Sequence, residues 1–365
     1  MIPIFKPSIT RKDMDAVLTC MVEETLGHGE ISKNFLKRLS QELEIPACFG
    51  LKEYPRALEM LLNVARIKAA SSMSPGEEKP EEGNKEIKET REIKALRVAL
   101  SVLSPAWYVK TIEALGFVPV FLDVDPDNCT IKFPKEMEPK KIADIFLVFH
   151  HLGYENDLSW ITDSQVPVIE DISQIFASRI KTKGREKKNV YGIFYLNETG
   201  FACGLGSVFV YAEDKKDKEE LRRCVEELDP CQLVTDTQGA MGSSQFNRLE
   251  KFFTRRQELR EVFMAALQKS RNKTFTVPEE PEHIAYTFPV VLKSGAKDVL
   301  TYAKKKKIGC ELAFDDSVLA MTPEKAGGDF PGAKGLTLRC MLFPLYPALS
   351  KEDIEITAKV LSSLP

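Results

Sequence analysis

The chain has 365 residues, of which 43% are hydrophobic and 29% charged, with a formal net charge of −3 at pH 7. Such a chain is long enough for one large domain and a smaller one, and it offers no strong positive field to nucleic acid or to an anionic membrane. No apolar run approaches the roughly 18 residues of a membrane span, and the first residues lack the apolar stretch of a secretory signal. We therefore expect a cytoplasmic protein without nucleic-acid or membrane partners.

The N-terminal part is predicted to be helical. Ser8 or Thr10 is a suitable cap for a helix over Asp13–Val22, and Ser32 for a second helix with apolar residues at helical spacing. A third helix is predicted over Pro55–Ala70, with its proline in the first turn.

A charged segment interrupts this pattern at residues 71–92. Its sequence is SSMSPGEEKPEEGNKEIKETRE, in which 11 of 22 residues are charged and none is aromatic. It has too little apolar surface to offset its ordering entropy, so we predict a disordered insertion, with a protein-docking segment as the open alternative.

From residue 95 onward, short apolar runs alternate with helical patterns, which predicts βαβ units in a mostly parallel sheet, an α/β fold. Right-handed crossovers place the carboxyl ends of such strands along one edge, so residues 104–107, 150–153, 171–174 and 197–203 are predicted to converge. The predicted strands are Val98–Leu103, Val118–Val124, Ile145–His150, Val166–Glu170, Val190–Leu196 and Ser207–Tyr211, with a helix at Val109–Leu115.

The last third of the chain has a different pattern. A long amphipathic helix is predicted over Phe246–Lys269, followed by strands near Ala285–Leu292 and Leu336–Phe343. The last helix is opened by the capping box Ser350–Asp353. We predict a large domain over residues 1–245 and a smaller α+β domain over residues 246–365.

Cysteine and histidine give no metal pattern. The eight cysteines include no CxxC pair, which indicates buried or incidental thiols and neither a disulfide framework nor a zinc site. His150 and His151 are adjacent in a predicted strand, so their side chains point to opposite faces and no third ligand is evident. We expect no metal.

Six segments of the chain form a recognisable series, namely IPIFKPSITRKDMDAV, GHGEISKNF, GFVPVFLDVDPDNCTI, HHLGYENDL, QGAMGSSQFNRLEKFFTRRQEL and FPLYPALSKEDIE. In this order they resemble the DegT/DnrJ/StrS family of sugar-nucleotide aminotransferases. The resemblance implies the three-layer sandwich of pyridoxal-phosphate (PLP) enzymes of the aspartate-aminotransferase fold, PLP as cofactor, a sugar nucleotide as ligand, and a homodimer with sites built across its two-fold axis.

The resemblance also assigns roles to residues of the predicted sheet edge. It implies that Asp171 pairs with the pyridine nitrogen of PLP, that Gln174 lies beside the ring, and that Trp107 or Tyr108 stacks on it. His150 matches the histidine of a family loop and is expected at the same edge. An aspartate at a strand end also commonly caps a helix, which leaves a purely structural role for Asp171 open. Without a cationic ring, a buried Asp171 requires other hydrogen-bond donors.

Two elements of the resemblance are replaced. The family's Schiff-base lysine falls on Thr199, whose hydroxyl cannot form an imine, so no catalytic residue is assigned. The phosphate-binding turn falls on residues 53–55, where Glu53 repels a dianion and Pro55 lacks an N–H donor. The lysines nearest to the Thr199 position form a charged turn that we expect to be solvated, namely Lys181, Lys183, Lys187 and Lys188.

A third element, the loop that reaches the partner subunit's site, is also replaced. Its asparagine and arginine fall on Cys231 and Leu233.

Three functions fit this sequence. The first is an aminotransferase-like protein that has lost transaminase chemistry and acts as a binding or regulatory partner, as a homodimer or in a heteromer with an active homologue. The second is a PLP-dependent sugar-nucleotide aminotransferase of polysaccharide or glycan biosynthesis with a substitute for the lysine. The third is an enzyme that uses the same cleft without a cofactor.

Overall fold

The computed structural model describes residues 1–71, 95–181, 189–276 and 283–365. Apart from Ser71, the last residue of α3 (Tyr54–Ser71), the predicted disordered insertion lies outside the described residues. No helix in these four ranges is long and apolar enough to cross a membrane.

A seven-stranded sheet with the order β1-β7-β6-β5-β4-β2-β3 forms the centre of the fold. The strands from β3 to β6 pair in parallel, whereas β7 pairs antiparallel with both β6 and β1. This confirms the predicted α/β fold with a mostly parallel sheet. The strands are β1 (Cys48–Leu51), which was not predicted, β2 (Arg97–Ser101), β3 (Val118–Leu122), β4 (Ile145–Phe149), β5 (Val168–Asp171), β6 (Val190–Leu196) and β7 (Ser207–Ala212).

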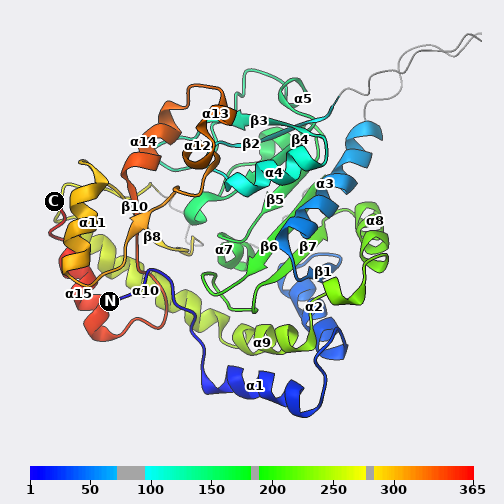
Figure 1. Ribbon diagram of the computed structural model, residues 1–365, viewed down its shortest axis with the longest axis horizontal. Coiled ribbons are helices and arrows are strands. Elements are labelled where there is room, and N and C mark those ends of the chain that lie inside the picture. Colours follow the sequence, from blue (N-terminus) through cyan, green and yellow to red (C-terminus); the bar gives the residue numbers. More distant parts are fainter. Residues whose placement is uncertain (72–94, 182–188, 277–282) are drawn as a thin grey trace, which may run out of the picture.

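Helices cover both faces of this sheet and give three layers (Figure 1). On one face α3, α4 (Ala106–Ala114) and α8 (Lys215–Glu226) pack on the sheet, and on the other face α2 (Glu30–Leu43), α7 (Phe176–Lys181) and α9 (Asp236–Phe246) do so. Because strand side chains alternate, Val208 and Val210 join the first core while Phe209 and Tyr211 join the second.

A three-stranded antiparallel sheet with the order β8-β10-β9 lies to one side of the large sheet, near both chain termini (Figure 1). It consists of β8 (Phe288–Val291), β9 (Glu311–Leu312) and β10 (Cys340–Phe343), and its core includes residues of α10 (Leu249–Leu267), α11 (Ala296–Lys305) and α15 (Lys351–Leu361). Ile2 belongs to this core and pairs with Ile308. The division at residue 245 stays a prediction.

Local sequence signals gave some helix ends correctly. Thr10 caps α1 (Arg11–Val22), its N–H and hydroxyl both donating to Asp13, and Ser350 opens α15 through the predicted capping box. The cap predicted at Ser32 is wrong, because α2 begins at Glu30 and Gly29 is its N-cap. Asp236 accepts hydrogen bonds from the Gly29 and Ser32 backbone amides at 3.0 and 2.8 Å, and Ser32 Oγ accepts from the Gly29 amide at 3.1 Å, so a distant carboxylate shares the cap with a local hydroxyl.

Two predicted elements of the last third also differ. The helix predicted over Phe246–Lys269 begins only at Leu249, and the preceding α9 is a separate helix capped by Thr235. The first half of the strand predicted at Leu336–Phe343 belongs to α14 (Pro331–Arg339), which has a proline in its first turn. The remaining short helices are α5 (Pro139–Ile142), α6 (Ser159–Thr162), α12 (Val318–Met321), α13 (Pro323–Ala326), η1 (His151–Gly153) and η2 (Pro230–Gln232).

A buried arginine of α10 connects the two sheets. Arg256 is 2% exposed, and its Nη1 donates to the carbonyls of Tyr286 at 2.6 Å and Leu345 at 2.9 Å. Its Nη2 donates to the carbonyl of Gly200 at 3.3 Å. Burial lowers the pKa of Arg256 to about 10, so the guanidinium keeps its charge at neutral pH.

Replacing this arginine should therefore destabilise the fold. Arg256→Met leaves two buried carbonyls and one half-buried carbonyl without their charged donor, and we expect a loss of roughly 2–4 kcal/mol in the free energy of unfolding. Arg255→Met is the matched control. Arg255 precedes Arg256 on α10, and its described interaction is a surface ion pair with Glu258. Its replacement should change stability by less than about 0.5 kcal/mol. Equal stability losses of the two variants in denaturant titrations would contradict this role.

Candidate functional site

A cavity of about 680 Å³ opens at the carboxyl ends of β4, β5 and β6. The starts of α3 and α4 close one side of it, and six aromatic rings contribute to its wall. Residues from three of the four predicted loop segments meet here. The lining residues are Lys52, Glu53, Tyr54, Pro55, Pro105, Trp107, Tyr108, Phe149, Asp171, Ser173, Gln174, Tyr195, Asn197, Thr199, Gly200 and Tyr286.

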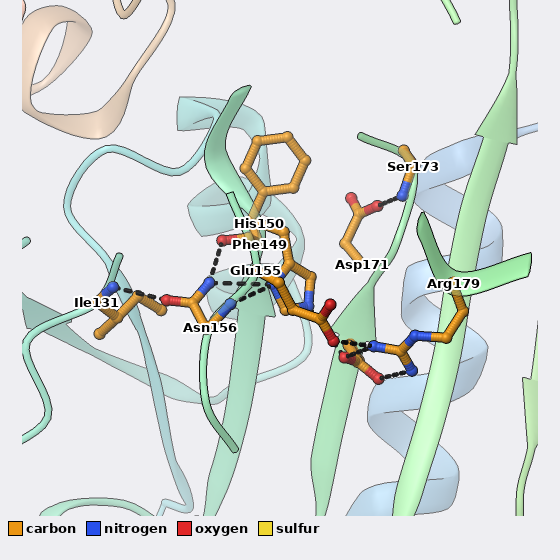
Figure 2. Close-up of polar contacts among 9 residues, drawn as sticks. Ile131, Phe149, His150, Glu155, Asn156, Asp171, Ser173 and Arg179 are labelled. Carbon is orange, nitrogen blue, oxygen red and sulfur yellow. Dashed lines mark hydrogen bonds and ion pairs between the residues drawn. The ribbon is translucent and has the colours of Figure 1, made fainter. Parts of the chain in front are cut away.

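Asp171 lies at the end of β5 and is only 1% exposed. Its Oδ2 accepts hydrogen bonds from the hydroxyls of Tyr54 and Tyr108, and its Oδ1 accepts one from the Ser173 amide at 2.8 Å (Figure 2 shows the Ser173 bond). Burial raises the pKa of Asp171, and these hydrogen bonds act in the opposite direction. The donors predicted for a buried Asp171 are therefore confirmed, and none of them is a cation.

The two phenols are held in a cluster of aromatic rings. Burial and the charge of Asp171 raise the pKa of both Tyr54 and Tyr108 well above the usual range of tyrosine, so both hydroxyls stay protonated and donate at neutral pH. The Tyr54 ring centre lies 4.9 Å from that of Trp107 and 5.8 Å from that of Tyr195. Trp107 and Tyr108, the two candidates for the stacking aromatic, thus both line the cavity.

Thr199 contributes a hydroxyl to the same cavity. Its Oγ1 donates to Asn197 Oδ1 at 3.0 Å and lies 3.2 Å from the hydroxyl of Tyr286. Gln174 also lines the cavity, and its Oε1 accepts a hydrogen bond from the Leu152 amide at 2.6 Å. The positions that the resemblance gives to the ring partner and to the lysine therefore lie in one cavity, but a hydroxyl stands in place of the amine.

No lysine is among the described contacts of Asp171. Lys181 pairs with Glu250 on the surface, as expected of a solvated lysine, but it ends helix α7 and does not lie in a turn. Lys183, Lys187 and Lys188 lie outside the described residues. Lys52 lines the cavity at the start of α3, but no ion pair with Asp171 is found.

His150 does not line this cavity, which corrects the prediction that it does. Its buried ring lies on the opposite face of the sheet, with Nε2 3.0 Å from Glu170 Oε1 and Nδ1 accepting from the Asn156 amide at 2.9 Å (Figure 2). Phe149, the preceding residue, is the one that faces the cavity. Alternation along the strand is the reason, since neighbouring side chains point to opposite faces.

The network around His150 includes two residues, Glu170 and Arg179, that were not predicted from the sequence. Glu170 is fully buried, and Arg179 of α7 binds it through both guanidinium nitrogens, with Nη1 3.1 Å from Oε2. Arg179 Nη2 also lies 3.1 Å from Glu155 Oε1. An acidic residue inside the apolar strand Val168–Asp171 was the available signal, because a buried carboxylate requires a charged or hydrogen-bonding partner.

The second histidine, His151, has no functional partner among the described contacts. Burial lowers its pKa to about 3, so the ring is neutral at pH 7. The four described ranges contain no group of three histidine, cysteine, aspartate or glutamate side chains that could hold a metal.

The third replaced element lies away from this cavity. Cys231 is exposed on η2, and Leu233 pairs with Leu51 of β1. Neither of them lines the cavity.

Three features of this cavity differ from what the resemblance implies for a PLP site. A covalent bond to the cofactor requires an amine, and Thr199 supplies a hydroxyl. One of the two Asp171 carboxylate oxygens, Oδ2, already accepts from two phenols. Glu53 and Pro55 stand at the helix start where a phosphate requires backbone donors.

Comparisons with known proteins agree with the fold. Residues 231–362 match the profile of the DegT/DnrJ/EryC1/StrS aminotransferase family. The uncharacterized protein MJ1066 of Methanocaldococcus jannaschii is 22% identical over 274 residues, which are 65% of this chain and 71% of that protein.

Solved structures match over nearly the whole length. The aminotransferase TlmJ from Streptoalloteichus hindustanus has a TM-score of 0.79 at 19% identity, with 99% of this chain and 98% of that chain covered. The E. coli GDP-4-keto-6-deoxy-D-mannose-3-dehydratase with bound hydrated PLP also has a TM-score of 0.79, at 13% identity with 99% of both chains covered. Residues 231–362 are thus similar to the DegT/DnrJ/EryC1/StrS aminotransferase family, and the whole chain shares its fold with these solved structures.

Proposed function

We propose that this chain does not transfer amino groups and acts as a binding or regulatory partner that keeps the aminotransferase fold. The observation that carries the proposal is Thr199, which lies in the cavity wall with its hydroxyl directed to Asn197 and Tyr286. A hydroxyl cannot condense with an aldehyde to form an imine, and it is a poor base for moving a proton.

The other end of the cavity supports the same proposal. Glu53 is exposed beside the start of α3, and Pro55 has no N–H to donate to a phosphate. A hydrogen bond to a charged group contributes about 1.5–3 kcal/mol, so the loss of two such bonds weakens binding by roughly two to four orders of magnitude. Repulsion by the Glu53 carboxylate acts in the same direction.

The proposal predicts that the protein forms no imine with PLP. Purified protein mixed with pyridoxal phosphate should give no visible absorption band, and borohydride treatment should add no mass to any cavity lysine. A reduced adduct on Lys52 would contradict the proposal and would favour a working aminotransferase with a substitute lysine. Turnover of a sugar nucleotide without PLP would instead favour the cofactor-free enzyme.

A second observation supports a protein partner. Three residues at helical spacing on α1, Met14, Leu18 and Val22, are 52%, 53% and 82% exposed. Ile9, Met21 and Leu26 are exposed in the same stretch of chain. Such a patch is typical of an interaction surface. The resemblance implies dimers, so we propose that this face binds a subunit of the same fold, either a second copy or an active homologue.

Light scattering with size-exclusion chromatography tests this surface. We expect the purified chain to be a dimer, or a monomer that dimerises with the homologue, and Leu18→Glu to abolish association. Leu338→Glu is the matched control, since Leu338 is 69% exposed on α14 and outside this patch. A monomeric chain that also fails to bind the homologue, or equal effects of the two variants, would refute the proposed interface.

A further inference from the structure

Tyr54 reaches the Asp171 carboxylate from the opposite wall of the cavity. It is the first residue of α3, whereas Asp171 is the last residue of β5, and the hydrogen bond between them joins positions 117 residues apart in the chain. The resemblance assigns the start of α3 to phosphate binding. In this structure that helix start places the Tyr54 phenol in the cavity, where it binds Asp171, the residue expected to pair with a pyridine nitrogen.

Other aromatic rings surround the ring of Tyr54. The planes of Trp107 and Tyr195 stand at 82° and 90° to it, and the Tyr108 ring is stacked at 22° with centres 6.1 Å apart. This environment suits a flat ring, because edge-to-face and offset stacked contacts are the favourable arrangements of aromatic pairs.

The hydroxyl of Tyr54 also has hydrogen-bond partners. Its hydroxyl donates to Asp171 Oδ2 and lies 3.2 Å from the hydroxyl of Tyr108, which donates to the same oxygen. An outside ring that binds Asp171 Oδ2 must displace this phenol and leave its hydroxyl without that acceptor, which costs about 1–3 kcal/mol.

We infer that the Tyr54 side chain itself occupies the ring site, the space beside Asp171 where a planar ring would bind. Tyr54 thereby determines which ligands the cavity accepts, because it excludes any outside planar ring from Asp171. The site that it fills is specific for a six-membered ring with one hydrogen-bond donor directed at the carboxylate. Ligands of the native protein are thereby confined to the rest of the cavity, beside Lys52, Asn197 and Thr199. The inference concerns the cavity of the proposed binding partner and deepens that proposal.

Chemical rescue of Tyr54→Ala tests the inference. The substitution removes the atoms of a phenol, so added phenol should refill the space and raise the melting temperature, with an affinity at least tenfold tighter than that of benzene, which has no donor. The native protein should show no such shift. Tyr195→Ala is the matched control, since Tyr195 lines the same cavity without a described bond to Asp171, and it should not distinguish phenol from benzene.

Pyridoxine supplies the second arm, because it has the pyridine ring without phosphate or aldehyde. Pyridoxine should bind to folded Tyr54→Ala. It should not bind to the native protein or to Tyr54→Phe, which keeps the ring and loses only the hydroxyl. Pyridoxine binding to the native protein, or equal affinity of Tyr54→Ala for phenol and benzene, overturns the inference. Neither result tests whether the native protein forms an imine. An imine formed by the native protein with pyridoxal phosphate refutes the proposed function, and the phenol and pyridoxine experiments can still be interpreted in that case.

Discussion

The buried carboxylate of Asp171 is the group on which the candidate site depends. A carboxylate that is 1% exposed persists only if hydrogen bonds replace its hydration, and two phenols and one backbone amide do so. Because these donors come from α3, α4 and the loop after β5, one charge holds three elements together. Two of these bonds occupy Oδ2, one of the two oxygens that could accept from a cationic ring, so the stability of the cavity and the proposed exclusion of the cofactor have one cause.

The last two residues of β5, Glu170 and Asp171, both carry carboxylates, but their side chains point to opposite faces of the sheet. Asp171 faces α3 and α4, whereas Glu170 faces α7 and binds Arg179. Glu170, Arg179 and His150 form a buried polar network on the face away from the cavity. Such a network is costly unless it is fully paired, and its pairing positions the strand end that carries Asp171. The network therefore supports the site from the other face of the sheet, and its residues do not line the cavity.

Much of the architecture could be predicted because the strands are continuous apolar runs and several helix ends have local signals, as at Thr10 and Ser350. The failures have tertiary causes. Asp236 caps α2 from a helix two hundred residues away, where local rules pointed to Ser32. Strand β1 is four residues long and is formed by pairing with β7, which leaves no strong periodic signal. His150 was misplaced because one residue of strand register reverses the face.

By itself, the amino-acid sequence determined the fold class, the position of Asp171 at the edge of the sheet and the absence of an amine at residue 199. These properties depend on residue identity and on periodicity along the chain, which are local. Only the tertiary structure decided that Tyr54 reaches Asp171, because the contact joins a helix start and a strand end that no local pattern connects. Side-chain direction in a cavity depends on the packing of several elements at once, and that packing exists only in the folded molecule.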